Sequence, residues 1–167
     1  MPPSRIPAWL LLFMLAVYAP PLWAKTVVGW VERAKVFYNA HTLELHAKID
    51  SGAKTSSLNA DNLVRFEKDG KPWVRFEVVD AQGEHVVVER PLLRTAKVRR
   101  HFGDTQVRPV IELGLCLGDI YEVTQFTLVD RTGFNYPLLV GRRYLDGHFL
   151  IDPGRTHLSK PACTPGK

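Results

Sequence analysis

The stretch LELHAKIDSGAKTSSLNA, from Leu43 to Ala60, decides how this sequence is interpreted. In its first half every second residue is apolar, from Leu43 to Ile49, and the residues between them are polar or charged. Because successive side chains of a strand point to opposite faces, this alternation predicts a β-strand with one face in the core. The strand ends at Asp50, which lies on the polar face.

The predicted strand runs directly into Asp50-Ser51-Gly52. A glycine allows a backbone turn that a side chain would hinder, and it leaves amide N–H groups free to point at a carboxylate. The sequence therefore predicts an acid that is held rigidly by backbone donors and a hydroxyl. For the tripeptide alone, an ordinary Asx-type turn that closes a strand is the simpler interpretation.

Most of the remaining chain consists of short β-type runs separated by turns that contain Gly and Asp. Such spacing is typical of a closed all-β domain. Tight turns are expected at Lys68–Lys71, Asp80–Gly83 and Phe102–Thr105. The strands that we expect are Thr26–Val36, Leu43–Asp50, Trp73–Val79, His85–Glu89, Leu92–Arg99, Val107–Leu113, Tyr121–Asp130 and Phe149–Asp152.

A second distinctive stretch is YPLLVGRRYLDGHFLIDP, Tyr136–Pro153. An apolar run ends at Gly141, and Arg142 begins a segment that has room for one or two helical turns before Gly147. Another apolar strand follows. The sequence thus predicts one short helix after Gly141 in an otherwise all-β chain.

The acid turn and the later LLVGR segment together resemble one lobe of a retropepsin-type aspartic protease, in which the two segments cross. The resemblance is closer still to a bacterial retropepsin-like family that carries the label ATP-dependent zinc protease. It extends over VVGWVE, AKIDSGAKTSSLNA, WVRFEV, RPVIELGLCLG, YPLLVGRRYL and FLIDP, which is nearly all of the chain after residue 24. The acid turn and LLVGR are its specific parts, while the middle matches mainly in pattern.

This resemblance implies a closed retropepsin-like β-barrel lobe and a set of site residues. Asp50 would be the catalytic carboxylate, Ser51 would bond to its outer oxygen, and Gly52 would supply a backbone donor. Gly141 would have a structural role, since it would let its segment pass beside the acid-bearing loop. The residues implied to bind substrate are Ala53, Lys54, Thr55 and Arg142.

Aspartic proteolysis uses two carboxylates that share one proton, so that one accepts a proton from the attacking water and the other protonates the scissile carbonyl. The chain carries one Asp-Ser-Gly motif of this kind. Asp69-Gly70 and Asp146-Gly147 do not follow an alternating strand and are expected to be turns. We therefore expect a homodimer in which Asp50 meets its symmetry mate.

Two departures from the family pattern favour a different class of function. Lys54 lies near the position where many retropepsins carry an acid that pairs with the arginine corresponding to Arg142. A retropepsin flap is rich in glycine, whereas the candidate flaps Asp80–Gly83 and Arg100–Gln106 contain one glycine each. The alternative is a non-catalytic periplasmic interaction module with the same fold, which would bind a membrane-bound partner.

The ends of the chain predict export. Residues 1–24, MPPSRIPAWLLLFMLAVYAPPLWA, have the pattern of a cleaved secretory signal peptide, so we expect a periplasmic or secreted protein. Residues 25–160 would form the retropepsin-like domain and residues 161–167 a flexible tail. An oxidising compartment would let Cys116 and Cys163 pair, with two unpaired thiols as the alternative.

The net charge of the 167 residues is +5, a mild excess. Basic residues gather at Lys97–His101 and Arg142–Arg143, which favours an acidic peptide substrate or an anionic membrane surface, with a solvated strand face as the alternative. Nucleic acid is not expected. Despite the family label, the sequence has neither His-Glu-x-x-His nor Gly-x-x-x-x-Gly-Lys, and its histidines are scattered singly. We expect no metal and no cofactor.

Overall fold

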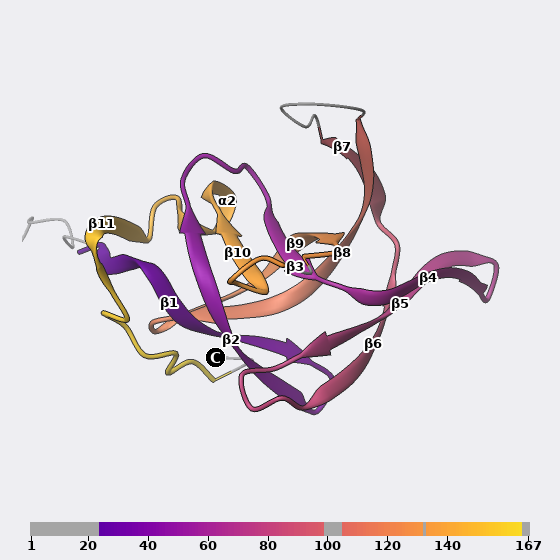
Figure 1. Ribbon diagram of the computed structural model, residues 1–167, viewed down its shortest axis with the longest axis horizontal. Coiled ribbons are helices and arrows are strands. Elements are labelled where there is room, and N and C mark those ends of the chain that lie inside the picture. Colours follow the sequence, from indigo (N-terminus) through magenta and orange to yellow (C-terminus); the bar gives the residue numbers. More distant parts are fainter. Residues whose placement is uncertain (1–23, 99–104, 132, 165–167) are drawn as a thin grey trace, which may run out of the picture.

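A computed structural model describes residues 24–98, 105–131 and 133–164 (Figure 1). The expected signal peptide, except Ala24, and most of the Phe102–Thr105 turn lie outside these residues. Strands dominate the described chain, which contains one short helix, α2, at Arg142–Leu145. The strands are β1 Thr26–Tyr38, β2 His41–Asp50, β3 Ser56–Asn59, β4 Asp61–Lys68, β5 Lys71–Val79, β6 His85–Pro91, β7 Arg94–Val98, β8 Gln106–Leu117, β9 Ile120–Val129, β10 Leu138–Gly141 and β11 Phe149–Thr156.

A closed barrel of six strands forms the body of the molecule. Its strands follow one another in the order β1, β2, β10, β3, β9 and β8, and pairing of β8 with β1 closes the ring. The barrel is mixed, because β2–β10 and β3–β9 are parallel pairs while the other neighbours are antiparallel. The predicted fold, a closed all-β barrel with one short helix after Gly141, is confirmed.

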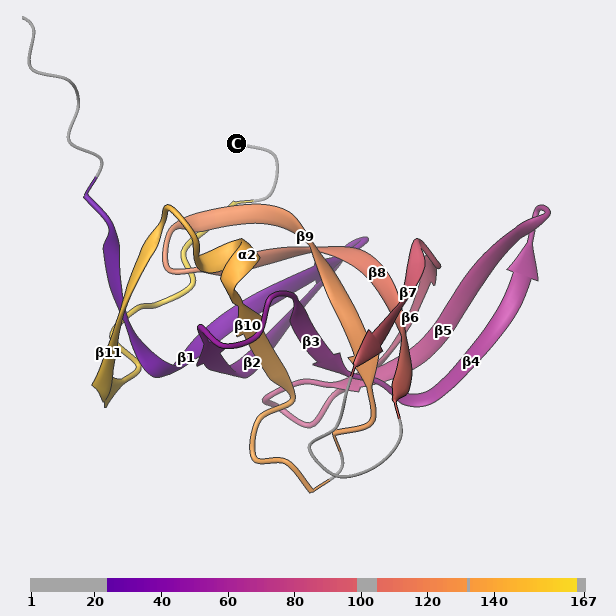
Figure 2. The same cartoon turned by 90° about the horizontal axis from the view of Figure 1, so that it is seen from above.

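The remaining strands extend the barrel at three places. β11 pairs in parallel with β1, and β7 pairs antiparallel with β8. β4, β5 and β6 form a separate three-stranded sheet. Its β4–β5 hairpin projects away from the barrel in both views (Figures 1 and 2). The loop between β2 and β3, helix α2 and the β7–β8 hairpin all reach the same side of the barrel, the upper side of Figure 1.

The barrel core is built from the alternating positions that the sequence marks. The apolar residues of β2, Leu43, Leu45, Ala47 and Ile49, are at most 6% exposed, while Asp50 is only partly buried. The alternation thus fixes which face of β2 is inside, as predicted.

Three strands lie outside the eight that the sequence predicts. β3 (SSLN) is buried at its first three residues, two of which are serines, so it lacks the pattern of alternating polarity. β10 (LLVG) is a continuous apolar run between two other strands of the barrel. Strands that are buried in this way do not alternate in polarity, so the alternation pattern misses β3 and β10. β4 is missed for another reason, because its adjacent apolar residues Leu63 and Val64 break the alternation and Val64 is 56% exposed.

Two predicted turns lie inside the described chain. At Lys68–Lys71, Asp69 and Gly70 have φ of 52° and 70°, the left-handed values that a two-residue hairpin requires. Asp80–Gly83 connects β5 to β6. Both predictions are confirmed.

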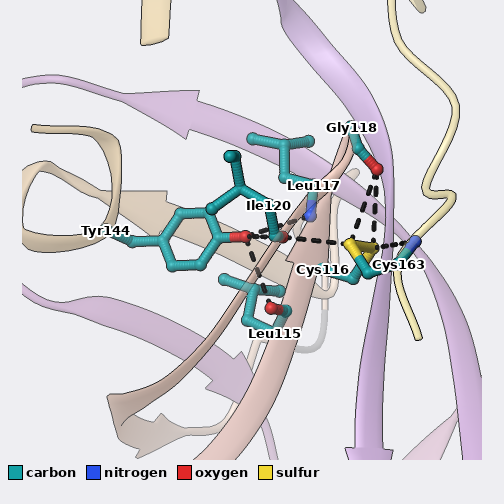
Figure 3. The surroundings of a disulfide bond; sticks show 7 residues. All are labelled: Leu115, Cys116, Leu117, Gly118, Ile120, Tyr144 and Cys163. Atoms are coloured by element: carbon teal, nitrogen blue, oxygen red, sulfur yellow. Dashed lines mark hydrogen bonds between the residues drawn. A yellow bond between two sulfur atoms is a disulfide. The ribbon is translucent and has the colours of Figure 1, made fainter. Parts of the chain in front are cut away.

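The expected flexible tail is instead fastened to the barrel, as far as its described residues extend. Ala162 donates a hydrogen bond of 2.7 Å to the carbonyl of Gly118. Cys163 forms a disulfide with Cys116, and their Cα atoms are 5.9 Å apart (Figure 3). The sequence offers this pairing as one of two alternatives for the cysteines, whereas the composition of the tail, rich in proline and small residues, predicts a flexible end.

A buried carboxylate fixes the segment that leads to the tail. Glu32 of β1 is fully buried and accepts hydrogen bonds from the amides of Gly29, Leu158 and Ser159 at 2.6, 2.9 and 3.1 Å. The hydroxyl of Ser159 adds a fourth at 3.1 Å. Four donors satisfy a charge that would otherwise be costly to bury.

Within the described residues, no helix is long and apolar enough to span a bilayer.

Candidate active site

The acid turn that follows β2 has the geometry that the sequence predicts. The amides of Gly52 and Ala53 donate to Oδ1 of Asp50 at 2.9 and 3.1 Å. Hydrogen bonds from backbone amides to a charged carboxylate are among the stronger ones in proteins, so these two restrict the orientation of the Asp50 side chain.

Ser51 differs from the expectation. It is exposed, and within the described chain its hydroxyl makes no hydrogen bond to Asp50. The two amides of the turn both approach Oδ1, and Ser51 lines a pocket of about 550 Å³ together with Lys54 and Arg142.

A glycine crosses this turn at close range. In the parallel pair of β10 and β2, Gly141 is opposite Asp50. A Cβ added to Gly141 would be 2.7 Å from the carbonyl carbon of Thr55 and 3.0 Å from the carbonyl oxygen of Ala53. These neighbours are backbone atoms that a side chain cannot displace cheaply, so the crossing requires glycine at this position.

Hydrogen bonds tie the crossing segments together. The amides of Arg142 and Arg143 donate to the carbonyls of Ala53 and Lys54 at 2.8 and 3.2 Å. The amide of Gly141 donates to Oγ of Ser56 at 3.1 Å. Because β10 continues directly into α2, these bonds join the helix to the acid turn.

The position of α2 is set by Tyr144, which is fully buried. Its hydroxyl accepts a bond of 3.0 Å from the amide of Leu117, at the end of β8, and donates one of 2.7 Å to the carbonyl of Ile120, at the start of β9 (Figure 3). Burial raises the pKa of Tyr144 well above its ordinary value. The disulfide lies beside the same turn, where Sγ of Cys163 is 3.1 Å from the carbonyl of Ile120.

The predicted substrate-binding residues line two different pockets. Ala53, Lys54 and Thr55 line a cleft between the acid turn and β7, with a volume of about 350 Å³. Arg142 lies instead on the larger hollow beside Ser51. The Arg142 side chain forms no ion pair with any described residue, which agrees with the absence of an acid at Lys54.

We call the smaller hollow the basic cleft. Four of the described side chains that line it are cationic and none is acidic. Sequence reasoning missed two of these cations, because they lie on β8 and just after β9 and no local motif marks them. The cations of the basic cleft are Lys54, Lys97, Arg108 and Arg131.

Arg131 is held firmly in the wall of the basic cleft. Its Nε donates to the carbonyl of Tyr136 at 2.9 Å and an Nη donates to Oγ of Ser57 at 3.1 Å. The guanidinium lies 4.8 Å from the ring centre of Phe134. Burial lowers the pKa of Arg131, as does the charge of Arg108, while the Asp50 carboxylate acts in the opposite direction.

The two candidate flaps have different positions. Asp80–Gly83 lies at the far end of β2 from the acid, since Ala81 donates to the carbonyl of Glu44. Arg100–Gln106 belongs to the connection between β7 and β8, of which residues 99–104 are not described. Lys97, on the described part of β7, faces the acid turn across the basic cleft.

The described residues do not fit a zinc centre. Nowhere in the described ranges do three or more His, Cys, Asp or Glu side chains gather in a way that could hold a metal ion. Both cysteines are in the disulfide, which removes the thiolates that zinc prefers.

The chain combines three features: a closed mixed barrel, an aspartate held by backbone amides at the end of β2, and a glycine of β10 that lies opposite this aspartate. Together they define one lobe of a retropepsin-like aspartic protease. The family model described as RimB-like, retropepsin-like aspartic endopeptidase RimB, matches residues 27–162, and the chain belongs to this family.

Individual relatives agree with this membership. The chain is similar to a solved structure of a Legionella pneumophila protein of unknown function, classed as DUF785, with 34% identity and a TM-score of 0.68, over 82% of this chain and all of that one. It is also 40% identical over 116 residues to a probable alpha-L-glutamate ligase of Parasynechococcus marenigrum, and 33% identical over 133 residues to one of Desulfotalea psychrophila. The chain spans 25% and 28% of the length of these two relatives, and the match covers 68% and 78% of this chain.

Proposed function

We propose that this chain is an active aspartic endopeptidase in which Asp50 is the catalytic carboxylate. The observation that carries the proposal is the amide-held position of Asp50, opposite Gly141 at the crossing of two barrel segments. The residues on either side of this carboxylate in the turn, Ser51 and Ala53, line two pockets, so Asp50 would be placed to act on a water molecule beside a bound peptide.

The proposed reaction needs two such carboxylates. One takes a proton from water, which attacks the scissile carbonyl carbon, while the other gives its proton to the carbonyl oxygen. The tetrahedral intermediate then collapses as the amide nitrogen is protonated and leaves. Two carboxylates held close together repel one another when both are charged, so the proposed pair would share one proton.

One chain supplies one acid turn, so the proposed enzyme is a homodimer. A two-fold axis beside the turn would bring Asp50 to its symmetry mate. Ser51 and Arg142, which are exposed on the hollow next to the turn, would then lie near the partner chain.

The proposed substrate is an acidic peptide segment. The cations of the basic cleft support this choice, because they would attract carboxylates and disfavour basic peptides. The names of the curated relatives, probable alpha-L-glutamate ligases, point to the same chemistry for those proteins.

The proposed compartment is the periplasm or the cell exterior. The disulfide between Cys116 and Cys163 supports it, since such bonds persist mainly in oxidising compartments. The sequence pattern of residues 1–24 supports it independently.

The test is cleavage of an acidic peptide mixture by the purified protein from acidic to neutral pH, beside Asp50→Asn. The matched control is Asp69→Asn, at an exposed hairpin position with φ of 52° that Asn tolerates well. We expect Asp50→Asn to abolish cleavage with little change in melting temperature, and Asp69→Asn to cleave normally. Wild-type rates in Asp50→Asn would exclude Asp50 as the catalytic group.

The second candidate is a non-catalytic interaction module with the same fold, bound to a membrane protein. Arg142 favours it, because its side chain forms no ion pair within the described ranges, whereas many retropepsins match this arginine with an acid. Light scattering over a concentration series separates the two candidates. A strict monomer cannot bring two Asp50 side chains together, and it would leave the module as the surviving candidate.

A further inference from the structure

The register of three neighbouring strands places Arg131 close to the acid. Leu139 of β10 pairs with Lys48 of β2 on one side and with Ser57 of β3 on the other. This row lies two residues before the row in which Asp50 of β2 pairs with Gly141 of β10. Same-face rows are separated by roughly 7 Å, the rise of two residues along a strand.

Arg131 lies just after β9, and one of its Nη atoms donates to Oγ of Ser57. The guanidinium therefore reaches the row of Ser57, Leu139 and Lys48 on the outer face of the barrel. Asp50 lies on the same face, because the alternating residues of β2 point inward. Ser57 is also two strands away from β2, and neighbouring strands are about 4.8 Å apart. A ligand that touches Arg131 therefore lies within roughly three or four residues of an extended peptide from a bond that Asp50 attacks.

The guanidinium is prepared for a ligand of definite shape. Bonds to Tyr136 and Ser57 and the contact with Phe134 fix its plane, so binding loses little rotamer entropy. An arginine has five N–H donors, and these two bonds use one donor each. The remaining donors form the planar fork that binds both oxygens of a carboxylate.

We propose that Arg131 is a specificity-determining residue that binds a carboxylate of the substrate, from an Asp or Glu side chain or the chain terminus, within about four residues of the bond that Asp50 cleaves. This inference rests on the proposed function and adds to it the residue and the position of recognition. Partial burial lowers the pKa of Arg131, and the neighbouring Arg108 acts in the same direction, so an incoming anion would offset an electrostatic cost that the free site bears.

Lys54, Lys97 and Arg108 have a different part in this proposal. They line the same cleft and would attract anionic peptides from solution. Lys54 and Lys97 are exposed, so their contribution should weaken with salt. The held guanidinium would be less sensitive to salt.

The activity test compares two peptides that differ only in Glu against Gln at the positions within about four residues of the cleaved bond. For wild type we expect kcat/KM to favour the Glu peptide, and Arg131→Gln to lower this preference roughly tenfold to a hundredfold. Arg131→Lys keeps the charge without the fork and should recover part of it. Arg33→Gln, on a side chain that is 58% exposed and paired with Glu44, is the matched control.

A purely structural role would lower kcat/KM for both peptides equally, and that result would overturn the proposal. Melting temperatures monitor folding, because Arg131→Gln also removes the bonds to Tyr136 and Ser57. If the Gln variant does not fold, the Lys variant carries the same comparison.

A binding test separates this proposal from the proposed function. Fluorescein-labelled peptides with four Glu or four Gln residues are titrated into Asp50→Asn, with and without Arg131→Gln, and anisotropy is recorded. If the Glu peptide binds to Asp50→Asn in a way that depends on Arg131, while wild type cleaves no peptide, the protease function is excluded and the carboxylate site is retained. Cleavage by wild type with a Glu preference unchanged in Arg131→Gln would keep the protease and remove the carboxylate site.

Discussion

Gly141 and Asp50 lie opposite one another in the parallel pair of β10 and β2, and the backbone of Thr55 passes directly over the glycine. The position of the acid turn is therefore set by a packing contact between backbones. A residue that is distant in sequence and carries no functional group controls where the carboxylate lies.

Replacing Gly141 with Ala should damage both stability and activity. The new Cβ would be 2.7 Å from a backbone atom, so the acid turn or β10 must move, and we expect a loss of about 1–3 kcal/mol in unfolding free energy. Urea denaturation and peptide cleavage measure the two effects. Gly154→Ala is the control, because its nearest neighbour is a side-chain oxygen at 3.3 Å; equal losses in both variants would contradict the packing argument.

Replacing Glu32 with Gln should destabilise the protein strongly for an isosteric change. The carboxylate receives four donors, and an amide would turn one oxygen into a further donor that faces N–H groups. We expect a cost of about 1–3 kcal/mol from buried groups left unsatisfied. Glu84→Gln, at an exposed turn position, should change the urea midpoint little. An unchanged midpoint in Glu32→Gln would mean that the neighbouring amides find other partners.

The disulfide should stabilise the fold. Cys116 and Cys163 are separated by 47 positions, and closing a loop of that order is worth about 2–4 kcal/mol, chiefly by constraining the unfolded chain. Cys116→Ser with Cys163→Ser should therefore lower the melting temperature, and a reducing agent should do the same to wild type but have no effect on the double variant. Identical melting with and without reductant in wild type would show that the bond contributes nothing.

Tyr144 should make stability fall at alkaline pH. Burial raises the pKa of its hydroxyl in the folded state above the unfolded value of about 10. The folded chain then holds a proton that the unfolded chain releases, so this contribution is complete below about pH 10 and declines as pH rises further. Unfolding free energies at pH 8 to 11 test this, because Tyr144→Phe should show a smaller alkaline decline, together with lower stability at pH 8 from the unpaired Leu117 amide. Parallel pH profiles for the two proteins would refute it.

The sequence predicted the parts of the site that are contiguous. The alternation before Asp50 and the glycine after it gave the strand, the inward face and the amide donors, because those interactions are local. The short helix after Gly141 followed from an apolar run and a glycine stop in the same way.

The sequence did not predict the parts that tertiary pairing creates. Arg131 enters the cleft only because β3 and β9 are parallel neighbours, and Glu32 becomes a structural centre only when residues 158 and 159 return to β1. Neither relation leaves a local pattern. Ser51 is a further difference, since the hydrogen bond to Asp50 that the family resemblance implies is not formed in the described chain, where two backbone amides bond to Oδ1.

The contacts of Glu32 also bear on when the chain can fold. Glu32 is in the first strand, and it obtains the amide of Leu158 from a segment 126 positions further along. Until residues 158 and 159 have been synthesised, the buried carboxylate lacks three of its four donors. This part of the fold therefore depends on contacts of very long sequence separation, which form slowly because a long loop must close before they are made.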